Sequence, residues 1–193
     1  MRKTNSRRAG AGLVSAACLA IVLAGCSLSH PDQLGGDAKW TASYTNIHDL
    51  TAHSDAAVAG SFTKEISHAT DTNGITRTDF GFTVTKVLAD KKASGLAAGS
   101  TITIQQTGGT DPDGKVFQLS EDPLFKIGDK SALFLKEFAP GHYAVIGGPN
   151  GRFNVRGGGS KVANGGDSVT PYNNLTAKFT GTVDQLATEV AKP

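Results

Sequence analysis

The sequence predicts a mainly β protein, a small barrel or sandwich with a short helix at each end of the fold. Apolar and polar residues alternate on both sides of residues 71–74 (DTNG), as they do in strands that bury one face. Residues 71–74 are themselves a turn sequence, because Asn and Gly tolerate positive φ. A helical spacing of apolar residues occurs only near 46–54 and 182–190.

The first expected element is a helix over residues 46–54, with Thr45 or Asn46 as its N-cap and Ile47 and Leu50 facing inward. The two alternating runs that follow are expected to form one long hairpin. The residues expected on its buried face are Val58, Phe62, Ile66, Phe80, Phe82, Val84 and Leu88.

Two further strands are expected in the middle of the chain. One covers residues 101–106, and a polar loop through 111–114 follows it. The other covers residues 131–138 and contains residues 132–135 (ALFL), which are apolar on both faces. A strand of this kind is buried on both sides, so we expect it to be the most buried strand.

A second hairpin is expected to join residues 143–146 to residues 152–156 across a glycine-rich turn. Residues 157–166 hold many glycines and are expected to form a loose loop. The chain then returns to helix, with Thr182 as N-cap and Gln185 three residues later. That spacing is typical of a capping box.

The N-terminal segment predicts export from the cytoplasm. Four basic residues, at positions 2, 3, 7 and 8, precede a weakly apolar run over residues 10–24. The run is about 15 residues long, shorter than the roughly 20 needed to cross a bilayer, so a signal peptide is expected rather than an anchor. The pair Arg7-Arg8 leaves both the general and the twin-arginine export routes open.

The apolar run ends at Leu23-Ala24-Gly25-Cys26. This tetrad resembles the lipobox of bacterial lipoproteins, in which the cysteine sulfur is diacylated and the chain is cut just before it. The resemblance implies a mature protein tethered to the extracytoplasmic face of the cell membrane through Cys26. Three regions are then expected: a signal peptide over 1–25, the lipidated cysteine and a flexible spacer over 26–44, and a single β-barrel domain with a C-terminal helix over 45–193.

Charge and cysteine content exclude several classes of function. The first 25 residues hold four of the 19 Lys and Arg residues and none of the 17 Asp and Glu residues, so the mature chain carries a formal charge of −2. No nucleic-acid partner is expected, because such proteins present a basic surface. Cys18 leaves with the signal peptide and Cys26 is acylated, so no thiol remains for a disulfide, a zinc site or a nucleophile.

Three segments suggest a more specific fold: residues 54–60 (SDAAVAG), 82–88 (FTVTKVL) and 128–135 (GDKSALFL). In this order and spacing they resemble the barrel strands of netrin-like domains, whose best-known members inhibit metalloproteinases. The resemblance implies a five-stranded barrel of the OB type. In that family a free N-terminal cysteine amine chelates the protease zinc. An acylated Cys26 has no such amine, so this inhibitory mechanism is not expected here.

No cofactor or metal is expected. Residues 109–115 (GTDPDGK) match the spacing of a phosphate-binding loop, but Val116 stands where Mg²⁺ binding needs Ser or Thr. The same stretch lacks the first aspartate and the final glutamate of a calcium loop, so a turn is expected. The five histidines include no H-E-x-x-H pair; they are His30, His48, His53, His68 and His142.

Tyr143, Arg152 and Arg156 are the candidate residues for a recognition surface, because Arg and Tyr are frequent at binding hot spots. The alternative is an ordinary strand in which Phe153 and Val155 face the core and both arginines face solvent.

These observations favour a membrane-anchored extracytoplasmic module that binds an unknown protein or small molecule and has no catalytic residues. Two alternatives stay open. One is an envelope enzyme, a hydrolase in which His142 and either Asp111 or Asp113 come together only in the fold. The other is a passive envelope component.

Overall fold

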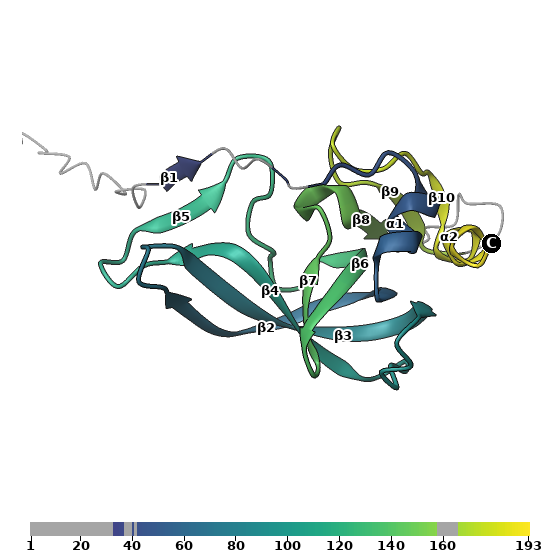
Figure 1. The fold of residues 1–193 in the computed structure, drawn as a ribbon, viewed down its shortest axis with the longest axis horizontal. Coiled ribbons are helices and arrows are strands. Elements are labelled where there is room, and N and C mark those ends of the chain that lie inside the picture. Colours follow the sequence, from purple (N-terminus) through teal and green to yellow (C-terminus); the bar gives the residue numbers. More distant parts are fainter. Residues whose placement is uncertain (1–32, 37–39, 41, 158–165) are drawn as a thin grey trace, which may run out of the picture.

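A computed structural model of the chain describes residues 33–36, 40, 42–157 and 166–193 (Figure 1). The expected signal peptide and Cys26 lie outside the described residues, as does most of the expected glycine-rich loop. The elements are β1 Gln33–Gly36, α1 Ile47–His53, β2 Ala56–Thr70, β3 Thr76–Asp90, β4 Thr101–Thr110, β5 Val116–Leu119, β6 Lys130–Ala139, β7 His142–Val145, the 3₁₀-helix η1 Gly148–Gly151, β8 Arg152–Arg156, β9 Ser168–Pro171, β10 Gly181–Thr182 and α2 Val183–Val190.

Five strands close into a barrel. β2 pairs with β3 and with β6, and β3 pairs with β4, all antiparallel. β7 closes the ring, because it pairs with β4 in parallel and with β6 antiparallel. The five-stranded barrel with a short helix on either side of it in the chain, predicted from the sequence, is confirmed.

Strand β6 belongs both to the barrel and to a second layer. Its residues 135–139 pair with β7, whereas its residues 131–133 pair with β8. β8 pairs in turn with β9, and β9 with β10, so these strands continue away from the barrel wall. The helices α1 and α2 contact each other on this side of the molecule (Figure 1).

Two apolar cores share the walls formed by β2 and β6. On β6, Leu133 and Leu135 point into the barrel while Ala132 and Phe134 point out, and all four are 0% exposed. This alternation is the normal period of a strand, and the predicted burial of the strand on both faces is confirmed. The barrel core holds Ala56, Val58, Phe62, Phe80, Phe82, Val84, Ile102, Ile104, Phe125, Leu133, Leu135 and Tyr143. The outer core, between the barrel wall and the helices, holds Ile47, Leu50, Ala57, Ala59, Ala132, Phe134, Ile146, Phe153, Val155, Val169, Ala177, Leu186 and Val190.

Both helices begin where the sequence predicts. The Asn46 side chain accepts a hydrogen bond from the backbone N–H of Asp49 at 2.8 Å and caps α1. Thr182 and Gln185 form the reciprocal bonds of a capping box at the start of α2. None of the helices in the described part of the chain combines the length and the apolar character that a membrane span requires.

The predicted second hairpin is wrong. β7 pairs with β4 and β6, and β8 pairs with β6 and β9, so these two strands are not neighbours. They are joined by η1, whose first residue Gly148 (φ 54°) and preceding residue Gly147 (φ 59°) are both left-handed. These two residues turn the chain toward the other half of β6 instead of back along β7.

Other departures from the sequence prediction involve strand pairing. β1 falls inside the expected flexible spacer but pairs in parallel with β5. Ile66 was expected on a buried face and is 47% exposed. The pairing of β2 with β6 ends at Ser61. Ile66 therefore lies in the half of β2 that no longer has β6 beside it.

Candidate functional site

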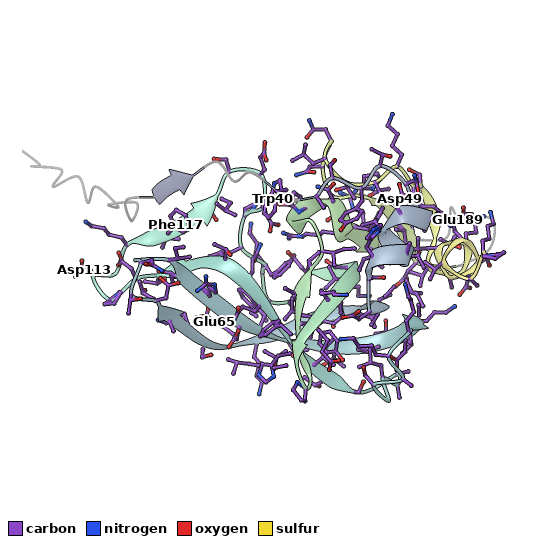
Figure 2. All side chains as sticks on the ribbon, viewed as in Figure 1. Trp40, Asp49, Glu65, Asp113, Phe117 and Glu189 are labelled. Atoms are coloured by element: carbon purple, nitrogen blue, oxygen red, sulfur yellow. The ribbon has the colours of Figure 1, made fainter. Side chains whose placement is uncertain are left out.

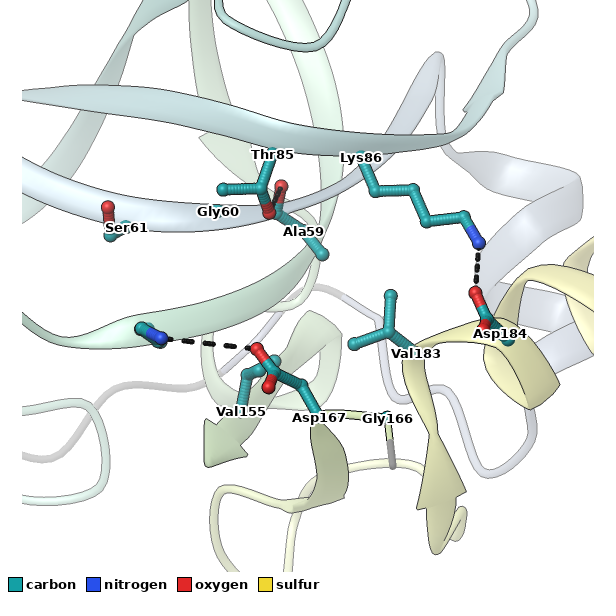
Figure 3. Close-up of a pocket in the computed structure, with 11 residues that line it drawn as sticks. Ala59, Gly60, Ser61, Thr85, Lys86, Val155, Gly166, Asp167, Val183 and Asp184 are labelled. Carbon is teal, nitrogen blue, oxygen red and sulfur yellow. Dashed lines mark hydrogen bonds and ion pairs between the residues drawn. The ribbon is translucent and has the colours of Figure 1, made fainter. Parts of the chain in front are cut away.

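A groove of about 270 Å³ lies between the outer face of the barrel and the layer that contains α2 (Figure 3). Its floor is formed by three small residues in a row on β2: Ala59, Gly60 and Ser61. Gly60 is required there, because a Cβ at this position would lie 2.1 Å from the Thr83 carbonyl oxygen. Ala59 and Ser61 carry short side chains, so the floor has no bulky group.

The groove has apolar and charged parts. Val155 from β8 and Val183 from α2 supply apolar side chains. An ion pair joins Lys86 on β3 to Asp184 on α2, and a second joins Lys130 Nζ on β6 to Asp167 Oδ2 at 4.0 Å (Figure 3). Both lysines therefore belong to the barrel, and both aspartates belong to the opposite wall.

These ion pairs are weakly held. The side chains of Lys86 and Asp184 are 40% and 79% exposed, and those of Lys130 and Asp167 are 53% and 42% exposed. Exposed pairs of this kind contribute about 0–1 kcal/mol each, because water screens the charges and the long side chains lose entropy. Lys86 and Asp184 can therefore change partners at little cost.

A second polar cluster, centred on Arg152, lies at the start of β8. The guanidinium carbon is 4.4 Å from the ring centre of Phe125 and 3.8 Å from that of Tyr172. Nη1 lies 3.3 Å from Asp122 Oδ1 and donates to the Pro123 carbonyl at 3.0 Å. The Nε atom is buried without a hydrogen-bond partner. The guanidinium is therefore enclosed by the protein's own rings and carboxylate.

The Arg152 cluster fastens the loop between β5 and β6 to the barrel. Burial raises the pKa of Asp122, and the charge of Arg152 opposes this shift. The Gln106 side chain donates to the carbonyls of Asp122 and Pro123 and accepts from the backbone N–H of Phe125. The adjacent cavity of about 90 Å³ has room for about three waters. We assign this cluster a structural role.

The structure does not bring the predicted recognition residues together on one exposed face. Tyr143 is buried in the barrel core, Arg152 is buried in the cluster just described, and Arg156 is exposed. Phe153 and Val155 face the outer core, as the ordinary-strand alternative predicts. The alternative places both arginines in solvent. This is correct for Arg156 but wrong for Arg152, whose guanidinium is covered by the rings of Phe125 and Tyr172.

The residues proposed for a hydrolase also lie apart. His142 is level with Thr103 on the neighbouring strand, whereas Asp111 follows the end of that strand eight residues later. At about 3.3 Å per residue this is roughly 25 Å along the strand. Asp113 lies at the tip of the β4–β5 turn (Figure 2).

The acidic loop at residues 111–115 is a turn, as expected. Asp111 Oδ1 accepts hydrogen bonds from the backbone N–H groups of Asp113 at 2.9 Å and Lys115 at 2.8 Å. Among the residues that the structure describes, no group of three or more His, Cys, Asp and Glu residues could hold a metal ion.

Sequence reasoning did not find the groove. Lys86 and Asp184 are 98 residues apart, and no local pattern around either marks them as partners. No protein-family model matches the chain, and no curated protein matches its sequence.

Proposed function

We propose that the protein is a lipid-anchored, extracytoplasmic binding module whose ligand occupies the groove over Ala59, Gly60 and Ser61. The observation that carries the proposal is the groove itself, with its floor of small residues, its apolar side chains and its exposed ion pairs. Ligand sites in proteins combine an apolar lining with a few placed polar groups in this way. The lipobox resemblance at Leu23–Cys26 supports the location.

The anchor would leave the groove accessible. Gln33 lies seven positions after Cys26, and a chain of that length spans at most about 25 Å. β1 and α2 lie at opposite ends of the longest axis of the molecule (Figure 1). A tether that begins at β1 therefore holds that end near the bilayer and leaves the groove, which α2 lines, at the far end.

Membrane fractionation tests the anchor. Cys26→Ser removes the sulfur that would be acylated, so we expect this variant to leave the membrane fraction. Cys18→Ser is the matched control, because Cys18 lies inside the signal peptide, and its location should stay that of the wild type. A Cys26→Ser protein that stays in the membrane fraction would contradict the anchor.

Native mass spectrometry of the detergent-extracted protein tests the binding role. Ser61→Phe places a large side chain on the groove floor, and we expect it to abolish a bound small-molecule mass that the wild type carries. Ser67→Phe, at an exposed position of the same strand, is the control and should keep that mass. Identical adducts in all three proteins, or none in any, would count against a ligand in this groove.

A further inference from the structure

We propose that the groove binds a zwitterion of about dipeptide size, a molecule with an apolar body, one cationic group and one anionic group. This inference rests on the proposed function, because it names the ligand class of the same groove. The groove separates charge between its two walls, and its apolar part has a limited size.

The two walls carry opposite charge. The cations, Lys86 and Lys130, project from β3 and β6 of the barrel, and the anions, Asp167 and Asp184, project from the segments that face it (Figure 3). A ligand lying across the groove meets ammonium groups on one side and carboxylates on the other. Its anionic end is therefore suited to the barrel wall and its cationic end to the wall formed with α2.

A zwitterion leaves every charge compensated. When it enters between Lys86 and Asp184, one internal ion pair is replaced by two pairs with the ligand. A simple anion would satisfy the lysine and leave the aspartate facing a like charge, and a simple cation would do the reverse. Charges left without a partner in a partly desolvated site are costly, so the groove discriminates against both.

The size of the groove limits the body of the ligand. A volume of about 270 Å³ equals the share of liquid volume taken by about nine waters. The apolar lining comes from Ala59, Val155 and Val183, all with short side chains. This space suits a dipeptide of small apolar residues better than a fatty acid or an extended polymer.

Equilibrium dialysis of the lipidated protein in nanodiscs against four probes tests the ligand class. The probes are L-valyl-L-alanine, its N-acetyl form, its C-terminal amide, and the form blocked at both ends, so size is constant while charge varies. We expect the free dipeptide to bind at least tenfold more tightly than each blocked form. Equal binding of all four, or binding of none, would overturn the proposal.

Charge variants locate the site. Lys86→Gln and Lys130→Gln should each weaken binding of the free dipeptide several-fold and leave that of the doubly blocked form unchanged. Lys64→Gln, on the exposed outer half of β2, is the control and should bind like the wild type. Equal weakening by all three variants would contradict the assignment to the groove.

The outcome separates this inference from the proposed function. If none of the four probes binds but Ser61→Phe still removes a native adduct, the zwitterion class is wrong and the binding module stands. If Ser61→Phe also leaves the adducts unchanged, the proposed function fails as well.

Discussion

Asp55 and Asp122 have nearly the same exposed fraction, yet the pKa values of their carboxyl groups shift in opposite directions. The two residues are 7% and 6% exposed, and each lies beside a cation. Burial alone raises the pKa of both. For Asp122 the raised pKa persists, whereas the pKa of Asp55 falls to about 2.

Two differences contribute: Asp122 lies deeper among protein atoms, and Asp55 has more donors. Asp55 accepts from Lys136 Nζ at 2.8 Å and from the backbone N–H of Glu137 at 3.1 Å, and Lys92 Nζ lies 3.0 Å away. Asp122 has one cation, Arg152, whose guanidinium is shared with Pro123 and two aromatic rings. A buried carboxylate keeps its charge when several donors replace the water it has lost.

The Lys86–Asp184 ion pair of the groove differs from both buried sites. Lys86 and Asp184 are largely exposed, so little desolvation opposes their charges and little energy is gained from pairing them. The three sites therefore form a series. Both side chains of the Arg152–Asp122 pair are buried, and at Asp55 only the carboxylate is buried. Both Lys86 and Asp184 are exposed to solvent. The first two hold the fold, and the third is free to exchange partners with a ligand.

Removing Arg152 should give the largest effect. Arg152→Ala leaves Asp122 buried without its cation and empties the space between two rings, so we expect a loss of about 3–5 kcal/mol in the free energy of unfolding. Urea denaturation measures it. Arg156→Ala, at the exposed end of the same strand, should stay within about 0.5 kcal/mol. Similar small losses in both variants would show that the enclosed pair is not special.

Asp55→Asn should cost less. Its lysine partners are half exposed and are rehydrated when the charge is lost, so we expect a loss of about 1–2 kcal/mol at pH 7. Asp113→Asn, in the β4–β5 turn, is the control, and urea denaturation of both variants at pH 7 measures the difference. A loss from Asp55→Asn no larger than that from the control would contradict the role given to the three donors.

The two carboxylates should give opposite pH dependence. The pKa of Asp55 is about 2 when folded and 3.8 otherwise, so the stability it contributes is present above about pH 4 and is lost as the pH falls toward 2. The folded pKa of Asp122 is raised from 3.8, so its contribution is present below that value and is lost as the pH rises through the folded pKa. Each site changes the free energy of unfolding by at most about 1.4 kcal/mol per pH unit.

Matched variants measure these two slopes. The stability advantage of the wild type over Asp55→Asn should shrink between pH 4 and 2. Relative to Asp122→Asn, the wild type should gain stability as the pH falls toward 3.8. Slopes of the same sign at both sites would show that the number of donors does not control the response.

Lys86→Gln should have the smallest effect on stability. Its ion pair is exposed, so we expect the free energy of unfolding to change by less than about 0.5 kcal/mol. Thermal unfolding without ligand is the measurement. A loss of more than 1 kcal/mol would mean that this ion pair is structural, and its exchange with a ligand would then be costly.

Features that depend on residues close in sequence were predictable, and contacts between residues far apart in sequence were less so. The caps at Asn46 and Thr182, the turn after β2 and the burial of β6 follow from residues close in sequence, and the structure confirms them. The burial of Arg152 was missed, because strand alternation says nothing about the rings of Phe125 and Tyr172 that cover it.

The candidate site was beyond sequence reasoning for the same reason. Its walls come from β2, β3, β6, β8 and α2, and the ion pairs across it join residues that no local spacing relates. The pairing of β1 with β5 was missed because a short glycine-containing strand has little pattern of its own.

Mass spectrometry of the N-terminal peptide from protein purified out of its native membrane tests the central claim most directly. A lipid-anchored module has a mature chain that begins at Cys26 and carries the added mass of two or more acyl chains on that residue. A chain in which residues 1–25 are still attached and Cys26 carries no lipid would contradict the account.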